Sequence, residues 1–131
     1  MSKRHGYRGY ITSRPFFGER APQHVQNLMI RDYCLRRQYH YLLSATEYVM
    51  PDCHMALEGV LAELPSLEGI VLYSLFQLPR DAQKREEIYG RVFANGATLH
   101  GALEDFPVAT ADDARRVEDL WLLRQFFDGG Q

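Results

Sequence analysis

The stretch Gly69-Ile70-Val71-Leu72-Tyr73, followed directly by Ser74, is the most continuous apolar run in the chain. Strands that are buried on both faces have unbroken aliphatic runs of this kind, because helices cover both sides of the sheet that contains them. Pro79 lies a little beyond, and proline ends such segments because it lacks the backbone N–H. The run therefore predicts a central strand of a parallel sheet.

Segments of alternating type lie on both sides of this strand. An aromatic, apolar run over 9–12 ends before Pro15, and apolar residues recur every three or four positions over 22–38, as on one face of a helix. Asn95-Gly96 is typical of a helix end, and Thr110 with Asp113 resembles a capping box at a helix start. The expected strands are 9–12, 39–44, 69–73 and 98–100, and the expected helices are 22–38, 52–64, 81–94 and 110–127.

Four successive strand–helix units predict an α/β fold, a three-layer α/β/α sandwich around a four-stranded, mainly parallel sheet. The expected strand order is 2-1-3-4, as in flavodoxin-like sheets. These units use almost all of the 131 residues, so we expect a single α/β domain over 1–131, with residues 1–8 and 128–131 as flexible ends.

Charge and hydropathy exclude several classes of protein. The chain has 15 basic and 17 acidic residues, a net charge of -2, so it lacks the overall positive field that attracts nucleic acid. No apolar run approaches the roughly 18 residues that cross a bilayer, and the first nine residues do not resemble a signal peptide. We therefore expect a cytoplasmic protein with no nucleic-acid partner and no membrane contact.

No cofactor or metal is expected. The glycine-rich loops that hold dinucleotides and nucleoside triphosphates are missing, and so is the Gly-x-Ser-x-Gly elbow. Cys34 and Cys53 do not have the spacing of a paired-cysteine metal site. His54 is adjacent to Cys53, but neighbouring residues of a helix point in different directions. We interpret the cysteines as small core side chains.

Polar side chains lie at the ends of the expected strands. Because parallel strands end at the same edge of a sheet, and ligands bind outside that edge, we expect these side chains to form one site. Aromatic residues in the same loops would supply apolar walls. The alternative is that they are ordinary turn and capping residues. The candidates are Ser13, Arg14, Ser44, Thr46, Glu47, Tyr48, Ser74, Gln77, His100 and Glu104.

Different roles suit different members of this set. Glu47 and His100 are the candidates for proton transfer, because imidazole titrates near neutral pH and burial raises the pKa of a carboxyl group. Ser13 is a candidate nucleophile, provided that a base lies within hydrogen-bond reach. Arg14 is the candidate for holding a phosphate or carboxylate, and the others are candidate substrate ligands. Each residue also has a purely structural interpretation.

The strand-end motifs are similar to those of a known family. Gly-Tyr-Ile-Thr-Ser-Arg-Pro-Phe at 9–16, Leu-Ser-Ala-Thr-Glu-Tyr at 43–48, Leu-Tyr-Ser-Leu-Phe-Gln-Leu-Pro at 72–79 and Leu-His-Gly-Ala-Leu-Glu at 99–104 resemble those of the sporadic carbohydrate cluster proteins. These proteins are encoded among genes for surface-polysaccharide or unusual-sugar synthesis. The resemblance spans nearly the whole chain and implies a sugar-biosynthetic setting, not a particular reaction.

The layout is also similar to that of the serine recombinase catalytic domain. Ser13 directly follows the first expected strand, Gln26 lies in the first helix and Arg80 follows the third strand. The recombinase signature has an arginine two residues before the serine, where this chain has Ile11, and an Asp-Arg pair that 74–79 lacks. Without these arginines, a phosphodiester transition state loses its charge stabilisation. The similarity thus implies a resolvase-like fold and argues against recombination.

These observations leave three hypotheses of function. In the first, the protein acts on a sugar or nucleotide sugar by acid/base chemistry, as an isomerase, epimerase or dehydratase. In the second, it is a non-catalytic partner subunit of a carbohydrate-cluster enzyme, which it contacts through aromatic residues including Phe16, Phe17 and Phe126. In the third, it is a degenerate recombinase-like domain. A homo-oligomer is compatible with each of them.

Overall fold

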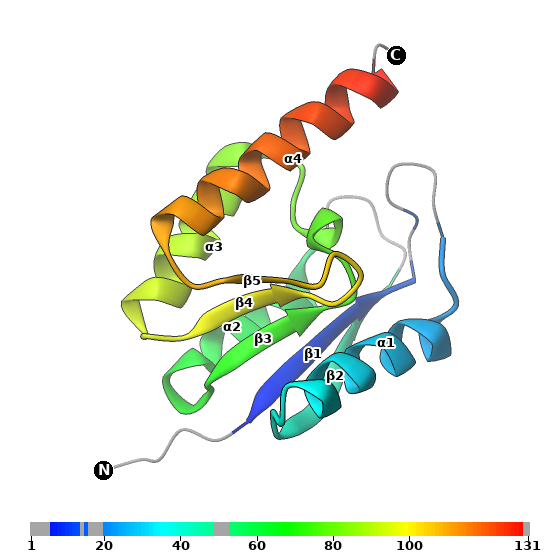
Figure 1. The fold of residues 1–131 in the computed structure, drawn as a ribbon, viewed down its shortest axis with the longest axis vertical. Helices are drawn as coiled ribbons and strands as arrows, with labels where there is room; N and C mark the ends of the chain where they lie inside the picture. Colours follow the sequence, from blue (N-terminus) through cyan, green and yellow to red (C-terminus); the bar gives the residue numbers. More distant parts are fainter. Residues whose placement is uncertain (1–5, 14, 16–19, 49–52, 130–131) are drawn as a thin grey trace.

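The computed structural model describes residues 6–13, 15, 20–48 and 53–129, and these form one sheet covered by helices on both faces (Figure 1). The strands are ordered β2-β1-β3-β4-β5 across the sheet, and every neighbouring pair is parallel except β4 and β5. The elements, in chain order, are β1 (Tyr7–Thr12), α1 (Gln23–Arg36), β2 (Tyr41–Glu47), α2 (Met55–Ala62), β3 (Gly69–Leu72), α3 (Ala82–Ala94), β4 (Thr98–Gly101), β5 (Phe106–Val108) and α4 (Ala111–Gly129). Short 3-10 turns, η1 (Leu64–Ser66) and η2 (Leu75–Gln77), flank β3.

The predicted α/β class and the order of the first four strands are confirmed. Strand β5 was not expected, and it pairs antiparallel with β4 at the edge of the sheet. Its three residues include Pro107, which donates no ladder hydrogen bond and is therefore tolerated only at an edge. A three-residue segment with a central proline has no alternating pattern, so the sequence contained no signal for this strand.

Several element boundaries differ from expectation. Tyr7 and Arg8, expected in a flexible terminal segment, begin β1, and β2 extends to Glu47 instead of ending at Ser44. The extension arises because Ala45 to Glu47 pair with the last three residues of β1, which gives their backbone groups partners. Thr46 and Glu47 are thus strand residues, not loop residues. The first residue of the expected second helix, Asp52, lies outside the described residues.

The two faces of the sheet have separate cores. On one face, α1 packs Ile30, Tyr33 and Cys34 against side chains of β1 and β3. On the other face, α2, α3 and α4 together form a larger apolar cluster with the alternate strand residues, including Tyr10 and Leu72. The division follows from the period of two along each strand. It decides which of the candidate residues can meet.

A partly buried ion pair joins α3 to α4. The Arg85 guanidinium, 3% exposed, donates to both carboxylate oxygens of Glu118 at 2.7 Å and lies over the ring of Trp121. It also donates to the carbonyl oxygens of Pro79 and Arg80, in the loop that follows β3. One side chain therefore holds that loop and two helices together.

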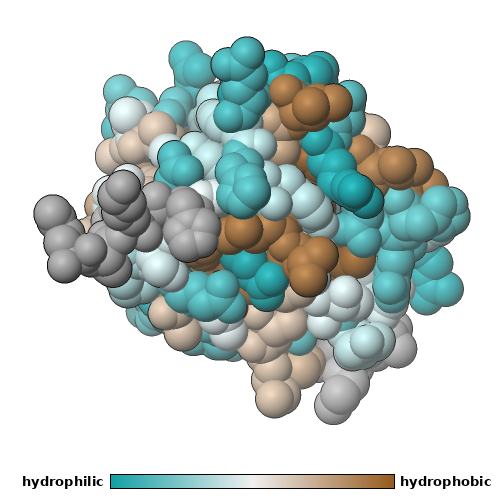
Figure 2. Space-filling model, turned by 90° about the horizontal axis from the view of Figure 1, so that it is seen from below, coloured by the Kyte–Doolittle hydropathy of each residue, from teal (hydrophilic) through white to brown (hydrophobic). Residues whose placement is uncertain are grey.

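The surface is mixed in character. In the view of Figure 2, apolar side chains reach the surface in separate groups between hydrophilic ones. Among the described helices, none is long and apolar enough to cross a membrane.

Candidate functional site

The carboxyl ends of β1 and β3 lie side by side at the centre of the sheet. The chain leaves β1 toward β2 on one side and later returns to β3 on the other, so the covering helices change faces between these two strands. Open α/β sheets bind their ligands in the crevice at this point. A cavity of about 460 Å³ opens beside the end of β1, lined by Ser13, Arg20, Ala21, Pro22 and Gln23.

The first turn of α1 contributes to this cavity, which we call the switch-point cavity. Pro22 occupies the cap position and makes no side-chain cap hydrogen bond, and the first turn of the helix has no acidic residue. The N-terminus of a helix favours negative charge. Arg20, also in the lining, adds a cation. The sequence-based candidates did not include Arg20, because it lies eight residues after Thr12, the last residue of β1, and nothing in the local sequence marks it.

Two buried glutamines support the wall of this site. Gln26 on α1 accepts a hydrogen bond from the Thr12 N–H (3.1 Å) and donates to the Thr12 and Ala21 carbonyl oxygens (2.7 and 2.8 Å). Gln77, in η2, donates to the same Gln26 oxygen at 2.9 Å. Both side chains are at most 3% exposed. This amide pair therefore fixes the end of β1 relative to the loop that follows β3.

The predicted residues Ser74, Gln77 and Glu104 do come together, and they bond to one another. The Ser74 hydroxyl donates to Glu104 Oε2 at 2.6 Å, and the Leu75 N–H donates to Oε1 at 2.9 Å. The Ser74 N–H donates to Gln77 Oε1 at 3.3 Å, in a capping box at the start of η2. These contacts tie the β3 loop to the β4 loop, and Ser74 is completely buried.

Glu47 has a capping role in the structure. Its carboxylate accepts hydrogen bonds from the N–H groups of Ala56 (2.9 Å) and Leu57 (3.1 Å), the second and third residues of α2, and from the Tyr10 hydroxyl (3.0 Å). His54 occupies the cap position of that helix without making a side-chain cap. The Glu47 carboxylate therefore replaces the missing cap from a neighbouring strand.

His100 lies on the opposite face, in the α1 core. Its Nδ1 is 2.7 Å from the Tyr33 hydroxyl, its Nε2 is 2.7 Å from the Thr98 hydroxyl, and the ring is 1% exposed. Burial, together with the charge of Arg37, lowers the pKa of His100 to about 4. The imidazole is thus neutral at pH 7. Because Glu47 faces Tyr10 and α2 while His100 faces Tyr33 and α1, the two residues do not share a site.

The remaining candidates are dispersed. Ser13 lines the switch-point cavity, but among the described residues its hydroxyl contacts the Glu47 main-chain oxygen (3.5 Å) and has no carboxylate or imidazole partner. The Ser44 hydroxyl bonds to that of Tyr41 at 2.8 Å and packs against Gly9, where a Cβ atom would collide with it. Thr46 lies in β2 beside Ile11, and Tyr48 is 69% exposed. Arg14, the predicted anion ligand, lies outside the described residues, as do Phe16 and Phe17.

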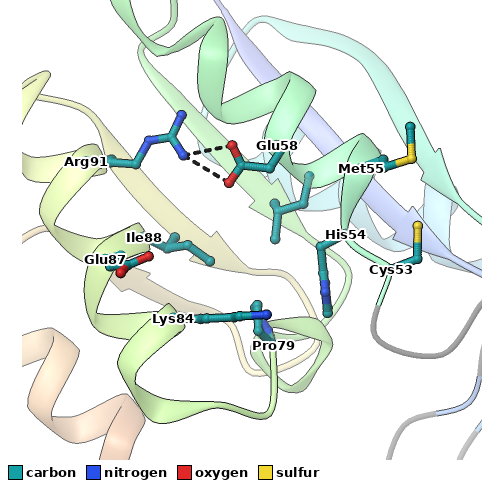
Figure 3. Close-up of a pocket in the computed structure, with 10 residues that line it drawn as sticks. Cys53, His54, Met55, Glu58, Pro79, Lys84, Glu87, Ile88 and Arg91 are labelled. Carbon is teal, nitrogen blue, oxygen red and sulfur yellow. Dashed lines mark hydrogen bonds and ion pairs between the residues drawn. The ribbon is translucent and has the colours of Figure 1, made fainter.

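A second, larger cavity lies between α2 and α3 (Figure 3). It measures about 600 Å³, and of the sequence-based site candidates that the structure describes, none lines it. We call it the α2/α3 cavity. Among the described residues, no group of three or more histidines, cysteines or carboxylates could hold a metal ion. The lining residues are Cys53, His54, Met55, Leu57, Glu58, Pro79, Lys84, Glu87, Ile88 and Arg91.

Comparison with known proteins gives a fold and no family. No protein-family model and no curated protein sequence matches the chain. Among solved structures, the crystal structure of the N-terminal catalytic domain of TP901-1 integrase is similar, with a TM-score of 0.62 and 13% sequence identity over 91% of this chain and 95% of that chain. At this identity the similarity shows the fold alone, and the chain accordingly has the resolvase-like α/β fold of that catalytic domain.

Proposed function

We propose that the protein binds a phosphate-bearing small molecule, a sugar phosphate or nucleotide sugar, in the switch-point cavity. The observation that carries this proposal is the cavity itself, which Ser13, Arg20 and the first turn of α1 line together. Backbone N–H groups and a guanidinium together suit a phosphate. The sugar part rests on the resemblance of the strand-end motifs to those of sporadic carbohydrate cluster proteins.

The proposal covers binding and does not include proton transfer by Glu47 and His100. Glu47 is occupied by the N-terminus of α2, and His100 is neutral and bonded to two hydroxyl groups on the other face of the sheet. The recombinase-like fold carries no DNA function into the proposal. A net charge of -2 gives no general attraction to a polyanion, whereas one local cation suffices for a small anion.

Thermal unfolding with UDP-glucose, glucose 1-phosphate and glucose tests this proposal. A ligand at ten times its Kd adds about 1.4 kcal/mol of stability, which for a domain of this size raises Tm by about 4 °C. We expect the two phosphate-bearing probes to raise Tm and glucose to have no effect. Arg20→Gln should remove the shift, and Arg115→Gln, which changes an exposed arginine on α4, should retain it.

Two results would contradict the proposal. One is the absence of a shift with either phosphate-bearing probe. The other is retention of duplex DNA at low salt by the wild-type protein but not by Arg20→Gln, which would assign the same cavity to a nucleic-acid backbone.

A second candidate function, that of a partner subunit, is favoured by the end of α4. This part of the helix extends away from the sheet (Figure 1) and exposes Leu122, Leu123, Phe126 and Phe127, each at least 54% accessible. Side chains of this size at an exposed site indicate a contact surface. Co-purification of a carbohydrate-cluster enzyme from the native host should be lost with Phe126→Ser and kept with Leu103→Ser, which alters an exposed leucine outside α4. Equal recovery with both variants would exclude this role for α4.

A further inference from the structure

The α2/α3 cavity has an apolar floor, with Glu58 and Arg91 at one end and Lys84 near the other (Figure 3). Leu57 from α2 and Ile88 from α3 are at most 5% exposed and form the floor, with Pro79 at one end. Its volume of about 600 Å³ is within the usual range for small-molecule sites. It shares no lining residue with the switch-point cavity, so a ligand here would be independent of the proposed function.

Two of the four charged residues in the described lining neutralise each other. Arg91 Nη1 lies 3.0 Å from both carboxylate oxygens of Glu58, and this pair closes the end of the cavity opposite Pro79 (Figure 3). A guanidinium held in this way satisfies the carboxylate that it contacts. The pair therefore leaves the ligand no net charge to match at that end.

The other two charged residues have no such partner. Lys84 and Glu87 lie three residues apart on α3, and neither makes an ion pair or hydrogen bond within the described part of the chain. Residues at this spacing are neighbours on a helix surface, with Cβ atoms about 5–6 Å apart. Figure 3 shows the Lys84 side chain extending toward Pro79 and His54, with Glu87 one turn further along the helix.

This distribution selects the charge of a ligand. The four charged side chains of the described lining sum to zero, so this part of the cavity wall favours neither an anion nor a cation. A monoanion on Lys84 would meet the repulsion of Glu87, and a monocation on Glu87 would meet that of Lys84. A molecule that carries one group of each charge on the same carbon atom pairs with both residues. The apolar floor requires, in addition, an apolar group next to these charges.

We propose that the α2/α3 cavity binds a small zwitterion with an apolar body, namely an α-amino acid with a large apolar side chain. Its carboxylate pairs with Lys84, its ammonium group pairs with Glu87 and its side chain covers Leu57 and Ile88. An aromatic or branched side chain fills the floor better than a short one, because binding strength grows with the apolar area removed from water.

Three matched probes test the charge requirement. L-phenylalanine carries both charges, 3-phenylpropanoate lacks the ammonium group and 2-phenylethylamine lacks the carboxylate. Titration of the full chain, followed by amide chemical shifts in NMR spectra, should show phenylalanine binding with shifts confined to residues 53–58 and 84–91. We expect each singly charged probe to bind at least about fivefold more weakly, within the range for a partly exposed charge-assisted contact. Equal affinity of the three probes would refute the zwitterion.

Substitutions on α3 test the assignment of residues. Lys84→Met and Glu87→Gln should each weaken phenylalanine binding about fivefold, and Glu86→Gln, which alters a neighbouring exposed carboxylate outside the lining, should leave it unchanged. All three positions are exposed, so the variants should fold. No binding at millimolar phenylalanine, unchanged binding in both lining variants, or shifts centred on residues 13–26 would overturn the proposal. None of these results depends on whether a phosphate-bearing ligand binds at the switch-point cavity.

Discussion

Lowering the pH from 7 to 5 should destabilise the fold by about 2 kcal/mol through one buried side chain, His100. In the folded protein the pKa of His100 is lowered to about 4, first by burial and then by the charge of Arg37, from an ordinary value of 6.5. Below pH 6.5 the unfolded chain binds a proton at this position and the folded chain does not. Stability is therefore lost as the pH falls from about 6.5 toward 4.

Urea unfolding at several pH values measures this loss. The free energy of unfolding of the wild-type protein should fall between pH 7 and pH 5, with an unchanged dependence on urea concentration. His100→Gln removes the titrating group and leaves an amide to face Tyr33 and Thr98. This variant will be less stable than the wild-type protein at pH 7. Its loss of stability between pH 7 and pH 5 should, however, be about 2 kcal/mol smaller than that of the wild-type protein.

The loss of stability between pH 7 and pH 5, compared in the wild-type protein and in His100→Gln, distinguishes the effect of His100 from that of the carboxylates. The guanidinium of Arg37 lowers the pKa of Asp105, and the N–H of Ala109 lowers that of Asp113. Such groups lose their stabilising effect mainly below about pH 4, outside the window used here. If His100→Gln lost as much stability between pH 7 and pH 5 as the wild-type protein, the assignment of the effect to His100 would be wrong.

Three further predictions concern buried polar contacts. Glu47→Ala leaves the Tyr10 hydroxyl and two N–H groups of α2 without their acceptor, so the free energy of unfolding in urea should fall by about 3 kcal/mol. The control Glu58→Ala, which alters an exposed carboxylate of α2, should lower it by less than about 1 kcal/mol. Gln26→Leu removes the acceptor of the Thr12 N–H and of the Gln77 amide, so the free energy of unfolding should fall by about 2–3 kcal/mol. The Ser13 amide signal in NMR spectra should broaden or shift, and an unchanged signal would show that Gln26 does not position the site. Glu118→Ala leaves the Arg85 guanidinium buried without its carboxylate, so the free energy of unfolding should fall by about 2–3 kcal/mol. The fluorescence of Trp121, which lies against Arg85, follows the unfolding, and a loss below about 1 kcal/mol would show that the ion pair contributes little.

The layout of the sheet could be predicted because it depends on local patterns. Unbroken apolar runs, helical periodicity and proline positions identify strand–helix units, and the handedness of crossovers leaves few ways to arrange them. The edge strand β5 was not predicted because Pro107 and a length of three residues give no periodic signal. The end of β2 was misplaced because pairing with β1, and not local propensity, extends the strand to Glu47.

The candidate site was predictable only in part. The sequence predicted Ser13, Ser74, Gln77 and Glu104 at or just after strand ends, and they lie there in the structure. The last three, however, form hydrogen bonds with one another. Arg20 was missed because it reaches the cavity from a loop position that has no sequence pattern. Roles for these residues toward a ligand stay predictions.

The sequence by itself determined the α/β class, the parallel sheet and the edge at which polar side chains gather, because each follows from the period of apolar residues and from chain direction. Only the tertiary structure decided which of those side chains face one another. Glu47 and His100 both lie at or near strand ends, yet Glu47 bonds to Tyr10 and α2 while His100 bonds to Tyr33 on α1. The face toward which a strand residue points depends on register, and a shift of one residue reverses it. Pairing between strands sets that register, and the pairing exists only in the folded chain.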